Sequence, residues 1–326
     1  MDYLSIIKQP IAQELEEFIA LFNQALTYPQ NGLLESALNH ICQRGGKRMR
    51  PILTLLMAKN YGEPCAVSYH SAIALELLHT ASLVHDDVVD ESGERRGQAS
   101  LNASFNNKVA VLVGDYVLST ALLHVSYTHQ QPIVENLSQL GRTLAAGELQ
   151  QLDNIQCKEI SEDVYYQIIE KKTAVLFESC ATLGALSVGA DNDALKQASK
   201  FGYNLGMMFQ IRDDIFDYFD AKEIGKPTGN DMTEGKLTLP VIYALHATND
   251  AEMLALAHKV KAGTVNADEI ATLVRFTKEH GGIEYAEQRM AAYSQQCMAF
   301  IETNVKEKAI RDALTAYVDY VVQRNY

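Results

Sequence analysis

Two acidic pentads of the same pattern, D-D-x-x-D, lie far apart in this sequence, and each sits in an apolar stretch that favours a helix. They occupy residues 86–90 (DDVVD) and 213–217 (DDIFD). On a helix, the first and last aspartates of each pentad share one face, with Cβ atoms about 6 Å apart, and their like charges repel. Magnesium would relieve this repulsion, because it prefers oxygen ligands and commonly bridges one or two carboxylates to phosphate groups. The two pentads therefore predict a helical protein whose carboxylate faces hold magnesium and a diphosphate.

A lone pentad has an alternative interpretation as a solvated acidic patch or a helix end, because short motifs also occur by chance. The repetition favours a metal site, and basic residues follow both pentads: Arg95 and Arg96 after the first, Lys226 and Lys236 after the second. The candidate catalytic aspartates are Asp86, Asp87, Asp90, Asp213, Asp214 and Asp217. The metal ligands predicted among them are Asp86, Asp90 and Asp213.

The composition argues against several other classes of protein. A net charge of −13 over 326 residues gives no basic surface for a nucleic-acid partner. The five cysteines are scattered and form no C-x-x-C pair, which is typical of reduced thiols in a cytoplasmic protein. No secretory signal is evident at the start of the sequence. No transmembrane segment is expected either, because no run of about 18 apolar residues occurs.

Apolar residues recur with helical spacing along the whole chain, and strand-like alternation is nearly absent. No linker, repeat or shift of composition divides the chain, so residues 1–326 are predicted to form a single all-α domain. Such a helical bundle can project polar side chains from facing helices into its interior. The predicted helices, with ends placed to about 2–4 residues, cover 3–26, 31–43, 49–61, 66–92, 102–128, 133–155, 161–188, 192–220, 233–247, 250–261, 266–280, 282–303 and 306–324.

Further polar residues are candidates for binding diphosphate groups. Lys47 and Arg50 follow two glycines at the start of a predicted helix, and the planar arginine side chain suits phosphate oxygens, although such a turn alone is more often a solvated loop. His79 precedes Asp86 by seven residues, about two helical turns, and so lies on the same side of the helix. The remaining candidates, which look like surface polar residues one at a time but can converge between the pentads, are Gln150, Lys172, Thr173 and Gln210.

In order along the chain, several motifs resemble those of the all-trans polyprenyl diphosphate synthases. They are GKRMR at 46–50, LVHDDVVD at 83–90, RRG at 95–97, GD at 114–115, KTA at 172–174, QIRDD at 210–214, GKP at 225–227 and DMTEGK at 231–236. The resemblance runs from about residue 40 to 245, and the spacing between motifs is also similar. It implies an all-α helical bundle of the isoprenoid synthase type around a central cavity, and a homodimer.

The resemblance also implies a reaction and a role for each residue. Three magnesium ions on the aspartates would bind an allylic diphosphate such as farnesyl diphosphate and neutralise the leaving group as it ionises to an allylic carbocation. Isopentenyl diphosphate would add its double bond to this cation, and proton loss would complete one trans addition. Isopentenyl diphosphate would be held by Lys47, Arg50, His79 and Arg96. The allylic diphosphate would contact Arg95, Lys172, Thr173, Gln210 and Lys226, with Lys172 counted among the catalytic residues.

By the same resemblance, product length depends on residues below the first pentad, where the growing hydrocarbon would run along the helix. About one turn before Asp86 lie Ala81 and Ser82, which are both small, whereas short-chain relatives tend to have an aromatic residue at that level. The sequence therefore favours a long product of the octaprenyl class, as in the side chain of a quinone.

Three other functions compete with this interpretation. A terpene cyclase also ionises an allylic diphosphate, but it usually pairs one aspartate pentad with a different second metal motif. A non-catalytic subunit of a heteromeric synthase would be expected to have lost a pentad or the basic turn, and this chain keeps all of them. An acidic metal-buffering helical protein would not account for the basic residues Lys47, Arg50, Arg95 and Arg96.

Overall fold

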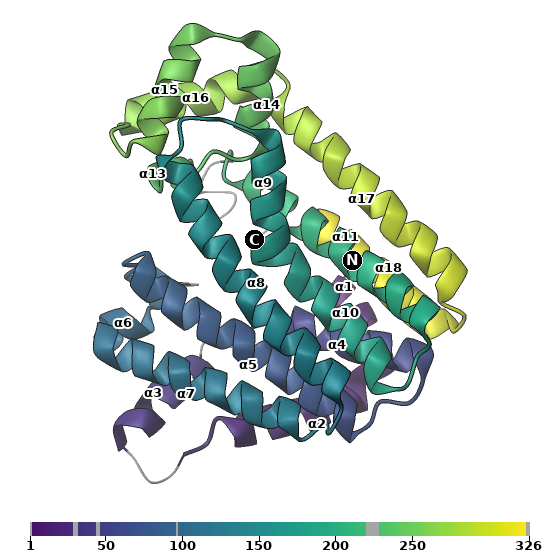
Figure 1. Ribbon diagram of the computed structural model, residues 1–326. Helices are drawn as coiled ribbons and strands as arrows, with labels where there is room; N and C mark the ends of the chain where they lie inside the picture. The colour runs from purple at the N-terminus through teal and green to yellow at the C-terminus, as the bar shows by residue number, and fades with distance from the viewer. Residues whose placement is uncertain (1, 29–31, 44–45, 96, 220–227, 324–326) are drawn as a thin grey trace.

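The computed structural model describes residues 2–28, 32–43, 46–95, 97–219 and 228–323. Two of the predicted diphosphate-binding residues, Arg96 and Lys226, lie outside these ranges. Nearly all of the described chain is helical, and Figure 1 shows long helices stacked side by side with a group of shorter helices at one end. The prediction of an all-α helical bundle is confirmed.

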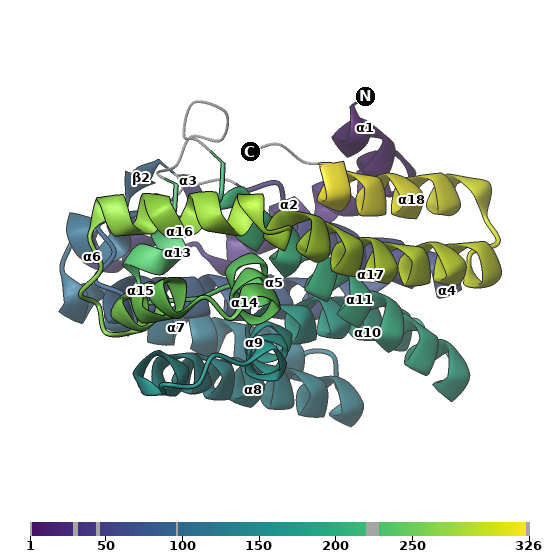
Figure 2. The same ribbon diagram turned by 90° about the horizontal axis from the view of Figure 1, so that it is seen from above.

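The first half of the chain contains α1 (Tyr3–Lys8), η1 (Gln9–Ile11), α2 (Ala12–Ala25), α3 (Gly32–Gln43), α4 (Met49–Tyr61), α5 (Ala66–Val89), β1 (Glu94–Arg95), β2 (Gln98–Ala99), α6 (Leu101–Ser104), α7 (Asn107–Ser126) and α8 (Gln131–Gln156). The second half contains α9 (Glu162–Ile169), η2 (Glu170–Ala174), α10 (Val175–Ser187), α11 (Asn192–Phe216), α13 (Asn230–Thr233), α14 (Leu239–Thr248), α15 (Ala251–Lys261), α16 (Ala267–Glu279), α17 (Gly282–Asn304) and α18 (Lys308–Gln323). The first and last helices lie side by side in both views (Figures 1 and 2), where Tyr3 Oη donates to Gln323 Oε1 at 2.7 Å.

Helix α5, which carries the first pentad, packs along α7. The two helices run antiparallel: His85 lies 3.4 Å from Asp115 near one end, and His70 lies 3.1 Å from His124 near the other. Gly114 permits this close approach, because a Cβ at that position would lie 2.3 Å from His85 Nε2. The end of α5 that bears the pentad is thereby held against the start of α7.

Helix α7 is the one helix in the described ranges that is long and apolar enough, by length and composition alone, to cross a membrane. One face of α7 packs on α5 through Ala110, Val113 and Val117. The opposite face leaves Leu112 at 68% and Leu123 at 50% exposed. The apolar residues of α7 therefore pack into the core on one face and are exposed on the other.

Several predicted helices are divided in the structure for identifiable reasons. The segment predicted as 3–26 is interrupted by η1, where Pro10 lacks the N–H that a helix interior needs. The segment predicted as 161–188 contains a π-helical turn, η2, between α9 and α10. Pro240 lies in the first turn of α14, a favourable position for proline, so the predicted helix 233–247 becomes α13 and α14. A short hairpin, β1 paired with β2, also follows the first pentad.

Candidate active site

The first pentad ends helix α5, and its three aspartates point to different surroundings. Asp86 is half-buried and Asp90 is exposed at the C-cap of α5. Asp87 is fully buried, and its Oδ1 accepts a hydrogen bond from Arg95 Nε at 2.5 Å. The β hairpin therefore brings Arg95, a predicted ligand of the allylic diphosphate, beside the pentad through an ion pair with its second aspartate.

The surroundings of the first pentad raise the pKa values of its first and last aspartates. Burial, and after it the nearby Glu148 carboxylate, raises the pKa of Asp86 to about 6 against the opposing effect of Lys172 and Arg95. The pKa of Asp90 is also raised, chiefly because neighbouring atoms partly desolvate its carboxyl group even though the residue is exposed, and Lys236 acts in the opposite direction. These carboxyl groups would ionise more readily beside an added cation.

The second pentad, on α11, directs its middle aspartate into the protein. Asp214 is buried, and its two carboxylate oxygens accept hydrogen bonds from Tyr165 Oη at 2.6 Å and Gln210 Nε2 at 2.8 Å. Burial raises the pKa of Asp214 well above its usual value, and the neighbouring Asp231 carboxylate raises it further. Asp213 is half-buried on the same turn. The sequence pattern gives no reason to expect Tyr165 here.

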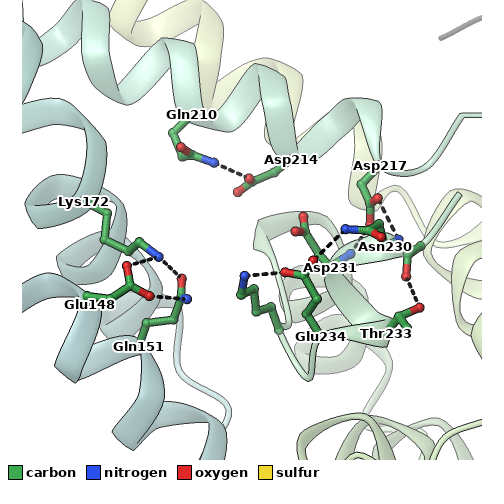
Figure 3. Close-up of polar contacts among 12 residues, drawn as sticks. Glu148, Gln151, Lys172, Gln210, Asp214, Asp217, Asn230, Asp231, Thr233 and Glu234 are labelled. Atoms are coloured by element: carbon green, nitrogen blue, oxygen red, sulfur yellow. Dashed lines mark hydrogen bonds and ion pairs between the residues drawn. The ribbon is translucent and has the colours of Figure 1, made fainter. Parts of the chain in front are cut away.

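Asp217, the last aspartate of the second pentad, caps the next helix. Its carboxylate accepts hydrogen bonds from the backbone N–H of Asn230 at 2.9 Å and of Asp231 at 3.2 Å, and its carbonyl accepts from Gly229 N at 2.8 Å (Figure 3). Gly229 is the N-cap residue of α13, so Asp217 satisfies two free N–H groups of this helix N-terminus from another part of the chain. Helix α11 ends at Phe216, before the predicted limit of residue 220, and Asp217 ties α13 to that end.

Lys236 links the surroundings of the two pentads. Burial would lower its pKa, but a hydrogen bond to Glu234 and the carboxylates of Asp231 and Asp90 raise it overall. Asp231 has its own pKa raised to about 7, first by burial and then by Asp217, with Lys236 opposing. One ammonium group is thus close enough to interact with a carboxylate near each pentad, and the two pentads belong to one acidic region.

The π-helical turn η2 presents Lys172 and Thr173 to the same region. Lys172 Nζ contacts Glu148 Oε2 at 2.6 Å and Gln151 Oε1 at 2.9 Å, and Figure 3 shows these three side chains opposite Asp231 and Glu234. Single π turns inside helices occur often at functional sites. Gly147 of α8 makes room for this one, since a Cβ there would lie 2.7 Å from Lys171 Cβ.

The basic turn before α4 is anchored by its middle arginine. Arg48 adopts a left-handed conformation (φ 53°) at the N-cap of α4, and its Nη1 contacts the buried Glu76 of α5 at 2.8 Å. Lys47 Nζ lies over the Tyr320 ring and Arg50 over the Phe177 ring, at 5.3 and 5.2 Å from the centroids. Arg50 Nε is buried without a hydrogen-bond partner in the described part of the chain.

On α5, about one turn before the first pentad, the two candidate residues for product length differ in burial. Ser82 is half-buried, and its hydroxyl donates to the His79 carbonyl at 2.9 Å. Ala81 is 2% exposed and packs in the core. One further turn down, Leu78 faces Gly141 of α8, where a Cβ would lie 3.5 Å from Leu78 Cδ1. His79 is half-buried on the Asp86 side of α5.

Some polar residues have partners that the sequence did not predict. Gln150 bonds to Gln167 at 3.0 Å and to Lys171 at 2.7 Å, while its neighbour Gln151 contacts Lys172. Gln150 thus contacts the residue before Lys172, and Gln151 contacts Lys172 itself. Helical spacing from an aspartate could not reveal Glu148 either, since it lies on another helix.

The carboxylates of the site suit a metal ion whose coordination is completed by the substrate. In the described ranges, no three His, Cys, Asp or Glu side chains gather as a ready-made metal site. Magnesium is often held by one or two carboxylates together with phosphate oxygens and water, rather than by a cage of protein ligands. Partly neutralised carboxylates with raised pKa values, such as Asp86 and Asp90, suit that mode of binding.

Comparisons with known proteins agree with this geometry. The polyprenyl synthetase family model matches residues 31–276. Octaprenyl diphosphate synthase of Haemophilus influenzae is 36% identical over 288 residues, which cover 88% of this chain and 87% of that protein. The solved geranylgeranyl pyrophosphate synthase from Bacteroides thetaiotaomicron is 48% identical with a TM-score of 0.88, covering 99% of this chain and 100% of that one. A polyprenyl synthase from Caulobacter crescentus, complexed with calcium and isoprenyl diphosphate, is 28% identical with a TM-score of 0.91, covering 99% and 98%.

The fold and the acidic region therefore define a class of enzyme, the prenyltransferases that build isoprenoid diphosphates. This chain belongs to the polyprenyl synthetase family, and it is an all-trans polyprenyl diphosphate synthase. The relatives named above differ in the product for which they are named, octaprenyl in one case and geranylgeranyl in another.

Proposed function

We propose that this enzyme adds isopentenyl diphosphate units to an allylic diphosphate such as farnesyl diphosphate and stops at a long product of the octaprenyl class. The observation that carries the proposal is the shared acidic region, in which Asp86, Asp90 and Asp231 have raised pKa values because burial outweighs the nearby lysines. Such a region favours binding of cations, and a diphosphate joined to them completes their coordination.

Magnesium, expected as three ions per site on Asp86, Asp90 and Asp213, would neutralise the diphosphate leaving group during ionisation. The residues of the chain bind and orient the substrate. Lys172 lies on the π turn at the rim of the acidic region, where an ammonium group can contact phosphate oxygens. Arg95, held beside Asp87, can do the same from the hairpin. Arg96 and Lys226 remain proposed ligands that lie outside the described residues.

Isopentenyl diphosphate is assigned to the basic turn. Arg50 Nε is a buried donor without a partner in the described chain, and a phosphate oxygen would satisfy it. Lys47 is available on the same turn, and His79 lies on the Asp86 side of the neighbouring helix. No protein nucleophile is required, because the double bond of the substrate attacks the allylic cation.

Mutations should separate the two diphosphate sites. Lys47→Ala and Arg50→Ala should chiefly raise the KM for isopentenyl diphosphate, because a charge-assisted phosphate contact contributes to binding in the ground and transition states alike. Lys172→Ala should mainly disturb kinetics with the allylic substrate. Initial rates with each substrate varied in turn would measure this division, and it would be wrong if all three variants weakened the allylic substrate alone.

A long product is supported by the small residues below the first pentad. Ser82 carries only a hydroxymethyl group, and Gly141 presents no side chain to Leu78 one turn further down. An aromatic ring at either level would fill space that a growing tail needs, because packed interiors accommodate such additions poorly. A geranylgeranyl product, the name carried by the 48% identical relative, is the alternative outcome.

Product analysis tests the length directly. The purified enzyme is incubated with labelled isopentenyl diphosphate and farnesyl diphosphate, with and without magnesium, and the chain lengths are separated by chromatography. Ser82→Phe and Ala81→Phe should shorten the main product to the geranylgeranyl range while broadly preserving the first condensation. Ser138→Phe, on the exposed side of α8, is the matched control. A wild-type product of 20 carbons, or wild-type length in both α5 variants, would overturn the proposed length or its control by these residues.

We also propose that the enzyme is a cytoplasmic homodimer that serves a quinone side chain. The exposed apolar face of α7, including Leu112 and Leu123, offers a surface for a second copy, because large exposed apolar patches commonly mark protein interfaces. The five free thiols suit a reducing compartment. Sedimentation of the wild-type enzyme tests whether it is a dimer. Leu112→Glu tests whether the exposed face of α7 forms the interface, and Leu149→Glu is a second exposed position, on α8.

A further inference from the structure

Tyr165 occupies a position that no sequence motif marked, and its side chain reaches the second pentad. It lies on α9, is 5% exposed, and donates its hydroxyl to Asp214 Oδ2 at 2.6 Å. A buried tyrosine hydroxyl normally needs a partner, and a buried carboxylate needs donors even more. The contact therefore joins two groups that would each be costly to leave alone.

The contact is the first step of a longer relay. Asp214 Oδ1 accepts from Gln210 Nε2 at 2.8 Å, and Gln210 Oε1 accepts from Thr173 Oγ1 at 2.6 Å. Four side chains from α9, α11 and the π turn are thus linked in the order Tyr165, Asp214, Gln210 and Thr173. The relay runs from the core to one of the residues assigned to the allylic substrate.

Hydrogen-bond chemistry fixes the direction of this relay. Tyr165 donates to Asp214 Oδ2, and with Asp214 ionised its Oδ1 can only accept, so the Gln210 amide turns its NH₂ group toward Asp214. Its carbonyl oxygen then faces Thr173, and the hydroxyl hydrogen of Thr173 is committed to Gln210. Removing the Tyr165 hydroxyl would leave Asp214 Oδ2 without its donor, and both Asp214 and the Gln210 amide could then reorient.

We infer that Tyr165 is a positioning residue for the allylic diphosphate site, acting through Asp214 and Gln210 to set the hydroxyl orientation of Thr173. The inference rests on the proposed function, because it takes Thr173 as part of the allylic site. Tyr165 itself contacts no substrate in this assignment. Its influence passes through side chains whose conformations it restrains, as hydrogen-bonded supporting residues commonly do in catalytic sites.

Tyr165→Phe tests this role, because it removes one oxygen and keeps the ring. The adjacent Tyr166→Phe is a matched control: the Tyr166 hydroxyl accepts from Arg289 Nε at 2.9 Å, outside the relay, and its ring packs edge-on against that of Tyr165. The first condensation is measured with farnesyl diphosphate varied at saturating isopentenyl diphosphate, and then the reverse. Tyr165→Phe should lower kcat/KM for the allylic substrate about tenfold, and the KM for isopentenyl diphosphate should change less than about twofold.

A double-mutant cycle with Thr173→Ala separates positioning from general damage to the fold. If Tyr165 acts only through Thr173, removing the Thr173 hydroxyl already removes the contribution of Tyr165. Tyr165→Phe should therefore have little further effect on the rate in the Thr173→Ala background. Independent, multiplying effects would overturn the inference, as would a Tyr165→Phe enzyme indistinguishable from Tyr166→Phe or one with both KM values raised together. If Thr173→Ala alone leaves allylic kinetics unchanged, the assigned allylic site fails and the inference with it. If Thr173→Ala is impaired and Tyr165→Phe is normal, only the relay fails.

Discussion

The first pentad keeps two carboxylates at the acidic region, whereas the second commits two of its three to the protein. Asp86 and Asp90 have raised pKa values and no ion pair within the described structure, and only Asp87 is paired, with Arg95. In the second pentad, Asp214 is held by Tyr165 and Gln210, and Asp217 caps α13. The same five-residue pattern therefore divides its carboxylates differently in the two places.

The difference follows from what comes after each pentad. The first lies at the end of α5, where the chain turns into a short hairpin from which Arg95 contacts Asp87. The second lies at the end of α11 and is followed by α13, whose free N–H groups need an acceptor. We therefore expect metal-dependent turnover to depend on the outer aspartates of the first pentad and on Asp213, and fold stability to depend on Asp214 and Asp217.

The largest expected effect is on turnover. Asp86→Ala and Asp213→Ala should each lower kcat by about 100-fold or more, because loss of a direct metal ligand should exceed the 10–100-fold loss typical of supporting residues. Circular dichroism should show the helical content unchanged. Asp193→Ala, an exposed aspartate in the first turn of the helix that carries Asp213, should remain near wild type. Near-normal magnesium-dependent activity in either pentad variant would reject the two-face metal site.

A second comparison sets Asp214 against Asp90 in stability rather than rate. Asp214→Ala leaves Tyr165 Oη and Gln210 Nε2 without their acceptor in a buried site, and an unsatisfied buried donor costs about 1–3 kcal/mol. Asp90→Ala removes a negative charge from a helix C-terminus, where it is unfavourable by about 0.3–1 kcal/mol. Urea unfolding in EDTA should therefore show Asp214→Ala destabilised and Asp90→Ala unchanged or slightly stabilised. Equal losses in both variants would remove the distinction between the pentads.

The helical fold and both pentads could be predicted from the sequence, because helical spacing and residue type are local properties. Helix α4 matches its predicted limits of 49–61, and residue type and order along the chain suffice to mark Lys172 and Gln210 as candidates. Tyr165 cannot be recognised in this way, since its link to Asp214 joins α9 to α11. The π turn is equally hidden in the sequence, as is the contact of Lys172 with Gln151 of α8.

The smallest effect concerns Asp217, where the two possible roles of an aspartate give opposite results for one substitution. Asparagine keeps one acceptor oxygen and turns an NH₂ group toward the other backbone N–H, whereas alanine removes both acceptors. If Asp217 chiefly holds the N-terminus of α13, Asp217→Asn should keep most of the turnover and lose less stability than Asp217→Ala, which should lose about 1 kcal/mol. If Asp217 is instead a metal ligand, the Asp217→Asn variant should lose magnesium-dependent turnover about as severely as Asp213→Asn, because an amide is uncharged. Magnesium titrations of kcat for the two asparagine variants, with urea unfolding of Asp217→Ala, distinguish these roles. We expect the Asp213 variant to need more magnesium and the Asp217 variant to titrate like wild type, because both Asp217 carboxylate oxygens already accept backbone N–H groups.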